Sequence, residues 1–552
     1  MTIINRVAMK KNVIIATLAF VAMPMLAQET YENAKIATED LNGTARYVGM
    51  GGAMEALGAD ISTISTNPAG IGLFRKSTVS TSFGIVSQQD AQEFAEGNKT
   101  NMSFDQIGFV YAARSGQNSY LNFGFNYHKS RNFDYILSAV GQLNSASQNG
   151  LSFVKAIGAD DENGFTLMNI EETNDGLMGT AYYTSQLDNL YYNNFIIDDQ
   201  GIPGWNAASE YELNRAHKGY IGEYDFNISG NVNDRIYLGL SVGLHDIHYK
   251  AYGEYFENLV NYQDKSVGTM TVCDERRITG TGYDLKFGAI FRPVETSPFR
   301  IGLSIATPTW YDLKTENNTR LVNGTDYKGY NNKDYSSNVY EFKLYTPWKL
   351  GLSLGHTIGN YLALGASYEY ADYAHLDSRY KTGSYYDYWY GDYYDESESD
   401  RVMNDHTKST LKAVSTLKLG LEFKPDPAIA VRFGYNYVSP MYNKEGYKDV
   451  GLDSYGTNYS TTTDFTNWKA TNRITCGIGY STGKFNVDLA YQYSASNGSF
   501  RPFMDSWGDY NYEDFNEKGE SIRMTEQIDN YSDPVNVSNK RHQLMVTLGY
   551  KF

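Results

Sequence analysis

Fourteen stretches of this chain alternate apolar and polar residues. The last one shows the pattern most clearly, because positions 544, 546, 548, 550 and 552 are all apolar or aromatic and the chain ends on Phe552. A period of two places these side chains on one face of a β-strand. We expect strands at 77–87, 102–113, 119–132, 218–230, 235–249, 280–292, 299–312, 340–355, 361–372, 407–424, 429–439, 466–481, 484–495 and 541–552.

The lengths of the connections distinguish two all-β architectures. Short turns are expected at 114–118, 231–234, 293–298, 356–360, 425–428 and 482–483, and they alternate with long polar loops such as 133–217, 250–279 and 373–406. A β-sandwich has no reason to gather its long loops at one end, whereas outer-membrane barrels have even strand numbers, short turns at one end and long loops at the other. The sequence therefore predicts an all-β fold, a 14-stranded antiparallel transmembrane β-barrel.

The net charge and the cysteine content of the chain bear on nucleic-acid binding, disulfide formation and metal binding. The net charge of −17 disfavours nucleic acid, and Cys273 and Cys476 are the only cysteines. We place Cys273 in a long loop and Cys476 on the lipid side of its strand, so they should not form a disulfide. Because no metal-type Cys/His spacing occurs, we expect no metal and no cofactor.

The first 27 residues predict export. Basic residues at positions 6, 10 and 11 precede an apolar run at 13–27. This is the layout of a secretory signal peptide, which we expect to be cleaved after Ala27. A start at Met9 would give a more conventional signal, so the true start, Met1 or Met9, stays open. Together with a barrel, the signal predicts the outer membrane of a Gram-negative bacterium.

Enzymatic motifs are weak. His245 and His248 suggest a metal pair, but residues three apart on a strand point to opposite faces, so we interpret them as polar residues at the outer end of a strand. Gly49-Met50-Gly51-Gly52 has Met54 where a nucleotide-binding loop needs its third glycine. We therefore do not expect an enzyme.

The region between the signal and the first strand is rich in small residues. It contains Ala45-Arg46-Tyr47-Val48-Gly49-Met50-Gly51-Gly52-Ala53 and then Asn67-Pro68-Ala69-Gly70. These motifs resemble the N-terminal hatch of the FadL/TodX-type outer-membrane transporters of long-chain fatty acids and other hydrophobic compounds. The resemblance is motif-specific only over about residues 44–75.

The resemblance implies three parts: a signal peptide at 1–27, a hatch at 28–76 and a barrel at 77–552. It also implies passive uptake of hydrophobic ligands such as long-chain fatty acids, with release through a side opening into the membrane. Asn67, Pro68, Ala69 and Gly70 match the hatch motif near that opening. It identifies no ligand-contacting residues. The expected partners are hydrophobic small molecules and outer-membrane lipid, and we expect a monomer.

Two long loops bear on the ligand and leave alternatives open. The loop at 133–217 has a weak amphipathic pattern at 151–168, suited to a lid over the barrel mouth. The loop at 373–406 mixes aromatic and acidic residues, which suits stacking on sugars, aromatic ligands or porphyrins, or simply a solvated loop. A surface-exposed binding or adhesion protein and a water-filled porin are therefore the alternative functions.

Prolines in neighbouring strands predict a weak place in the wall. Pro308 and Pro347 fall at nearly the same height of the seventh and eighth expected strands. Each removes one donor from the ladder. The interpretations are a pair of bulges at the rim, or a seam that forms or adjoins a lateral exit, as opposed to an exit in the wall beside Asn67.

Overall fold

The computed structural model describes residues 30–157, 168–173, 176–181, 185–196, 204–329, 334–387, 392–450, 454, 456–515 and 521–552. The signal peptide predicted at 1–27 lies outside the described residues. None of the helices formed by the described residues is long and apolar enough to cross a membrane.

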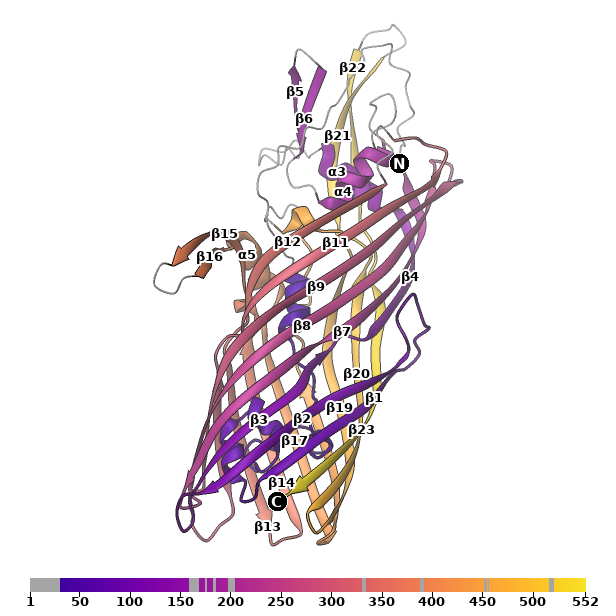
Figure 1. Cartoon of the computed structure of the whole chain (residues 1–552). Coiled ribbons are helices and arrows are strands. Elements are labelled where there is room, and N and C mark those ends of the chain that lie inside the picture. The colour runs from indigo at the N-terminus through magenta and orange to yellow at the C-terminus, as the bar shows by residue number, and fades with distance from the viewer. Residues whose placement is uncertain are drawn as a thin grey trace.

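Antiparallel strands form one closed barrel of 14 spans, which confirms the predicted fold (Figure 1). The barrel closes where β23 pairs with β1. Four spans are each made of two consecutive strands: β3 and β4, β10 and β11, β12 and β13, and β14 and β15. The strands of this sheet are β1 (Thr78–Gln88), β2 (Thr100–Arg114), β3 (Tyr120–Asn132), β4 (Tyr135–Ala146), β7 (Ala207–Val232), β8 (Ile236–Val260), β9 (Ser266–Phe291), β10 (Arg300–Ala306), β11 (Trp310–Thr325), β12 (Tyr335–Tyr345), β13 (Lys349–Ile358), β14 (Leu362–Asp372), β15 (Asp377–Asp387), β16 (Asp392–Ser399), β17 (Ala413–Asp426), β18 (Ile429–Val438), β19 (Phe465–Thr482), β20 (Phe485–Arg501) and β23 (Val535–Lys551).

The barrel is apolar outside and polar inside. Leu238, Leu303 and Phe433 point outward and are 57 %, 58 % and 59 % exposed, whereas the inward-facing Asn122 and Ser241 are fully buried. Lipid solvates the outer set, while polar groups of the interior find hydrogen-bond partners within the lumen. This distribution is that of a membrane-spanning barrel.

Several expected loops are strands. β7, β8 and β9 extend well beyond the predicted strand ends, because the hydrogen-bonded ladders between them continue without a turn. The β7–β8 ladder, for example, runs from the pair Val232↔Ile236 to the pair Ala207↔Val260. Cys273 accordingly lies in β9 and not in a loop, and both cysteines are free. The predicted strand at 407–424 begins only at Ala413, because Arg401–Thr410 forms helix α5.

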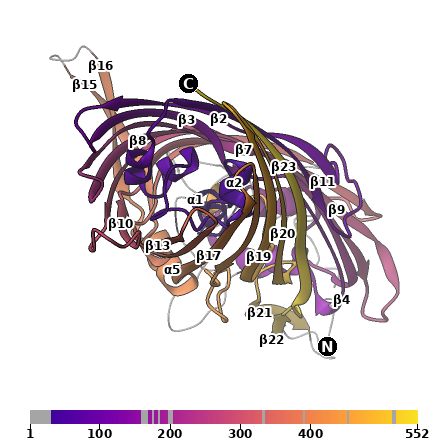
Figure 2. The ribbon, with the colours of Figure 1, turned by 90° about the horizontal axis from the view of Figure 1, so that it is seen from below.

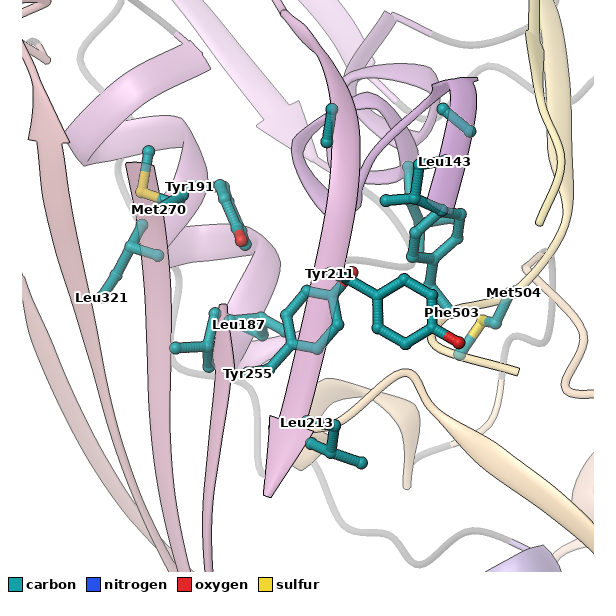
Figure 3. Close-up of a cluster of buried hydrophobic side chains, with 14 of the residues drawn as sticks. Leu143, Leu187, Tyr191, Tyr211, Leu213, Tyr255, Met270, Leu321, Phe503 and Met504 are labelled. Carbon is teal, nitrogen blue, oxygen red and sulfur yellow. The ribbon is translucent and has the colours of Figure 1, made fainter. Parts of the chain in front are cut away.

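The outer end of the barrel carries a cap. Its elements are α3 (Gln148–Ile157), β5 (Met168–Thr173), β6 (Gly176–Ala181), α4 (Gln186–Tyr191), the π-helix η3 (Tyr192–Ile196), β21 (Ser506–Phe515) and β22 (Ser521–Asn530). Helices α3 and α4 and the β20–β21 connection pack on the long strands through an apolar cluster that includes Tyr191, Tyr211, Tyr255 and Phe503 (Figure 3). The aromatic and acidic loop forms the hairpin β15–β16, which projects from the side of the barrel (Figure 1).

Residues 30–77, here called the luminal segment, lie inside the barrel (Figure 2). The segment comprises helices α1 (Thr30–Ala37) and α2 (Ala45–Gly49) and the 3-10 turns η1 (Ile61–Ser65) and η2 (Pro68–Leu73). Helix α2 contacts β18, β19, β20 and β23, and η2 contacts β3, β7, β8 and β9. Two further 3-10 turns are η4 (Tyr373–His375), which lies within the wall between β14 and β15, and η5 (Thr457–Tyr459), which lies in the β18–β19 connection.

Candidate ligand cavity and wall openings

The Asn67-Pro68-Ala69-Gly70 motif packs directly on the barrel wall. The Asn67 side chain accepts a hydrogen bond from Ala69 N (3.2 Å) and so caps η2. The carbonyl of Pro68 accepts a hydrogen bond from Ser229 Oγ of β7 (2.7 Å). Opposite the motif, the β8–β9 and β9–β10 ladders are uninterrupted. The motif therefore lies against a closed part of the wall.

The outer face of this part of the wall is hollowed. A groove of about 990 Å³ spans β3, β7, β8, β9, β10, β13 and β14. Its sides are exposed apolar residues such as Leu238, Phe287 and Leu303, and its floor includes Gly239 and Gly288. Since Pro68 and Asn67 pack against these same glycines from inside, little more than backbone separates the luminal segment from the lipid.

Pro308 and Pro347 lie opposite each other between two intact parts of the same strand pair. The β10–β13 ladder ends at Ala306↔Lys349 and the β11–β12 ladder begins at Trp310↔Tyr345. Across the interruption, Thr309 N donates to Thr346 Oγ1 (2.8 Å) and Thr346 N donates to the carbonyl of Thr309 (3.1 Å). The ladder is interrupted there, but the two strands remain joined.

A second interruption, not foreseen from the sequence, lies beside the third span. The β2–β3 ladder ends at the pair Gln106↔His128. Above it, β3 and β4 pair only with β7 among the strands that the structure describes. We call this unpaired edge, from Lys129 to Ile136, the third-span opening. No alternation pattern marks it, because both strands keep their apolar and polar faces; only the pairing partner is missing.

Side chains and the luminal segment take the place of the missing strand. The carbonyl of Lys129 accepts a hydrogen bond from Asn42 Nδ2 (3.0 Å). Asp40 N donates to the carbonyl of Ser130 (2.8 Å), and Asp40 Oδ2 accepts from Asn132 N (3.1 Å). The backbone groups of a buried strand edge need such partners. The luminal segment therefore seals the third-span opening.

Gln88 closes the upper part of the same opening. Its side-chain amide donates to the carbonyl of Ile136 (2.7 Å) and accepts from Ile136 N (2.8 Å), which is the pair of bonds that a neighbouring strand would make. Gln88 is 7 % exposed, so water does not supply these bonds.

Three arginines meet at Asp40 just inside this opening. Arg131 of β3, Arg473 of β19 and Arg541 of β23 have guanidinium nitrogens 3.1, 3.5 and 3.9 Å from the Asp40 carboxylate. Arg131 Nε is buried and has no hydrogen-bond partner among the described residues. Three guanidinium groups against one carboxylate leave an excess of positive charge.

The arginines border a cavity of about 330 Å³ between the luminal segment and the wall. Aromatic side chains line other parts of it, among them Tyr31, Phe133, Tyr249, Tyr373 and Trp468. The cavity therefore offers both aromatic surface and guanidinium groups, and its lining also carries the carboxylates of Glu32, Glu39, Glu369 and Asp464. The amino-acid sequence alone does not reveal this cavity, because its lining residues come from strands far apart in the chain.

The two histidines of the His245–His248 sequence do point to opposite faces. His248 is exposed and hydrogen-bonds Asp246 (2.8 Å), whereas His245 is buried in the lumen beside Asp284 (3.0 Å). His245 therefore lies inside the barrel in the middle of β8 (Ile236–Val260), and not at the outer end of its strand as predicted.

No family model matches the chain, and no curated protein matches its sequence. Among solved structures, the chain is similar to the toluene transporter TbuX of Ralstonia pickettii, with 11 % identity, coverage of 93 % of this chain and 99 % of that chain, and a TM-score of 0.46. A Pseudomonas aeruginosa FadL homologue gives 12 % identity, 94 % and 100 % coverage and a TM-score of 0.46. The Pseudomonas putida toluene transporter TodX has 11 % identity, with coverage of 94 % of this chain and 100 % of that chain, and a TM-score of 0.45.

These structures are of the FadL and TodX type that the N-terminal motifs indicate. At such identities and TM-scores, the likeness says nothing by itself about the ligand of this protein.

Proposed function

We propose that this protein is an outer-membrane channel for passive uptake of hydrophobic compounds with an acidic head group, such as long-chain fatty acids. The luminal segment acts as the hatch, and the ligand leaves sideways through the wall. The observation that carries the proposal is the cavity that joins aromatic surface to the arginines around Asp40. Guanidinium groups bind carboxylates through charge-assisted hydrogen bonds, and the aromatic surface suits an apolar tail.

A binding experiment tests the head-group preference. Purified protein in detergent should bind oleate more tightly than oleyl alcohol, which has the same chain without the charge. Because a hydrogen bond to a charged group contributes about 1.5–3 kcal/mol, Arg473→Gln should weaken oleate binding roughly 10- to 150-fold and leave oleyl alcohol unchanged. Arg277→Gln removes one positive charge from the exposed face of β9 and serves as the control. Equal affinity of the native protein for both ligands would refute the head-group assignment.

We propose that the exit is the third-span opening, because it combines an unpaired strand edge with the arginines around Asp40. The Pro308–Pro347 seam and the wall behind Asn67 are the competing positions. Two engineered cysteine pairs in a background without native cysteines separate them. Asn42→Cys with Asp105→Cys, bridged by a short reducible thiol cross-linker, pins the luminal segment over the opening, since the tips of the native side chains hydrogen-bond at 3.1 Å and their Cβ atoms lie too far apart for a direct disulfide. Thr309→Cys with Thr346→Cys locks the seam.

Uptake of oleate into proteoliposomes should stop in the cross-linked form of the first pair and recover when the cross-link is reduced. It should continue in both forms of the second pair. Loss of uptake only with the second pair would move the exit to the Pro308–Pro347 seam. Uptake that continues when either pair is bridged would leave the wall behind Asn67 as the remaining candidate for the exit.

The β15–β16 hairpin favours a second function, surface binding. It projects from the barrel and exposes Tyr385 (50 %) and Tyr386 (41 %) (Figure 1). Deletion of residues 382–396, beyond the part of β15 that pairs with β12, should leave oleate uptake largely intact if the protein is a channel. Loss of binding to a surface partner with unchanged uptake would show that both functions coexist.

A further inference from the structure

The inner wall of the barrel carries a buried cluster of ionisable side chains that transport of an acid does not explain. The cluster joins β3, β7, β8 and β9, and each member is less than a tenth exposed. Its members are His128, Glu223, Asp225, His245, Asp284 and Lys286.

Lys286 engages one oxygen of each acidic residue. Its Nζ contacts Glu223 Oε1, lies 2.9 Å from Asp225 Oδ1 and lies 3.1 Å from Asp284 Oδ1. The second oxygen of each carboxylate points away from the lysine, toward an imidazole.

His128 faces two of these remaining oxygens without bonding either. Its Nε2 lies 3.6 Å from Glu223 Oε2 and its Nδ1 lies 3.7 Å from Asp225 Oδ2. Both distances exceed an ordinary hydrogen bond. Asp225 is fully buried, yet its Oδ2 has no hydrogen-bond partner among the described residues.

His245 shows the same feature on the other side of Glu223. Its Nε2 is paired with Asp284 Oδ2 at 3.0 Å, which favours the tautomer with the proton on Nε2 and a free lone pair on Nδ1. That Nδ1 is buried, has no hydrogen-bond partner in the described part of the chain, and lies 3.9 Å from Glu223 Oε2.

The charges of the cluster do not balance. Three carboxylates and one ammonium leave two negative charges when both imidazoles are neutral. Uncompensated buried charge is expensive, and a single divalent cation would remove the imbalance.

We propose that His128, Glu223 and Asp225 bind a divalent transition-metal ion such as Zn²⁺. Their ligand atoms lie within 4.8 Å of one another, and one imidazole nitrogen with two carboxylates is a donor set that suits Zn²⁺. An ion takes one nitrogen of the imidazole, and His128 Nε2 lies 3.6 Å from Glu223 Oε2. With bonds of about 2.0–2.2 Å, tetrahedral ligands lie roughly 3.3 Å apart, so ligand atoms within 4.8 Å of one another need to approach by about 1.5 Å at most.

The position of the site suggests both a route for the ion and a consequence. His128 lines the 330 Å³ cavity, through which an ion can arrive. His128 is also the last residue of β3 that pairs with β2. A bound ion would tie β3 to β7 immediately below the third-span opening.

Zinc titration of the full-length protein tests the site. The protein is purified without a polyhistidine tag, stripped with EDTA and titrated with ZnCl₂ in a calorimeter, with the metal content measured by mass spectrometry. We expect one Zn²⁺ per chain, at least tenfold weaker binding in His128→Gln and in Asp225→Asn, and unchanged binding in His248→Gln. The heat-dependent gel mobility of a folded barrel checks that each variant has folded.

Binding that persists in both His128→Gln and Asp225→Asn would overturn the proposal, as would the absence of saturable binding to the native protein. In the second case, higher heat resistance of the stripped protein at pH 5 than at pH 8 would indicate that the imidazoles take up protons in place of a metal. X-ray absorption of the zinc-bound native protein should show one imidazole in the first coordination shell, and a spectrum without imidazole would also refute the assignment.

Discussion

The contact between the luminal segment and the wall makes a prediction at Gly239. A Cβ added at Gly239 would lie 2.5 Å from both Ala69 N and the carbonyl oxygen of Pro68, and would also collide with Pro68 C. Ordinary contacts begin at 3.4 Å, so Gly239→Ala must push the motif away from β8 by about 1 Å. At Gly124 of β3, by contrast, a Cβ meets Asn227 Cβ and Ile64 at an ordinary 3.4 Å.

The two substitutions should therefore have different effects on the free energy of unfolding. Replacing glycine by alanine in a strand favours the fold by about 0.5–1 kcal/mol, whereas overpacking costs about 1–3 kcal/mol. We expect Gly239→Ala to be destabilised by about 1–2 kcal/mol and Gly124→Ala to be neutral or slightly stabilised.

Urea unfolding of the protein in detergent measures these differences, and hydrogen exchange reports where they arise. Gly239→Ala should raise exchange at residues 67–73 and leave the outer cap unchanged. Equal unfolding midpoints for Gly239→Ala and Gly124→Ala, with equal exchange at residues 67–73, would refute the close packing of the motif on the wall.

Two further predictions concern the cap and the third-span opening. Burial alone would raise the pKa of Asp188, but the Lys155 ammonium at 2.9 Å and hydrogen bonds lower this pKa below its ordinary value of 3.8. The stability that the Lys155–Asp188 pair gives α4 should therefore be present above about pH 4 and be lost as the pH falls below 3.8. Asp188→Asn leaves Lys155 buried and unpaired, which should cost about 3–5 kcal/mol of hydrogen-exchange protection in α4, and adding Lys155→Met should restore most of it. Gln88→Leu should speed hydrogen exchange of the Ile136 amide more than tenfold. Gln89→Leu should not, because the Gln89 side chain hydrogen-bonds Asp90 on the surface.

The fold was predictable because the membrane imposes the same requirement on the sequence of every span. Every span must show an apolar face to lipid, and the alternation in segments such as 484–495 and 541–552 records this directly. The upper ends of β7–β9 were missed because they leave the membrane. Above it they lie between the cap and solvent, where no apolar outer face is required and the sequence resembles a polar loop.

The candidate sites were less predictable. The height of Pro308 and Pro347 could be calculated from the turns, because rise along a strand is regular. The meeting of Arg131, Arg473 and Arg541 could not, since it depends on barrel closure and on where the luminal segment places Asp40. In the same way, a missing ladder leaves no trace in the alternation of either strand.

Asp40 links ligand binding to the wall in the proposed mechanism. Its backbone N–H and its carboxylate hold the edge of β3, and the same carboxylate is the counter-ion of Arg131, Arg473 and Arg541. A ligand carboxylate that reaches these arginines competes with Asp40 for them. Asp40 then loses part of the electrostatic attraction that holds it at the edge of β3. Its hydrogen bonds to Ser130 and Asn132 should therefore weaken when a ligand is present. A neutral hydrocarbon would not compete in this way, and this difference makes the head group part of the opening step as well as of recognition.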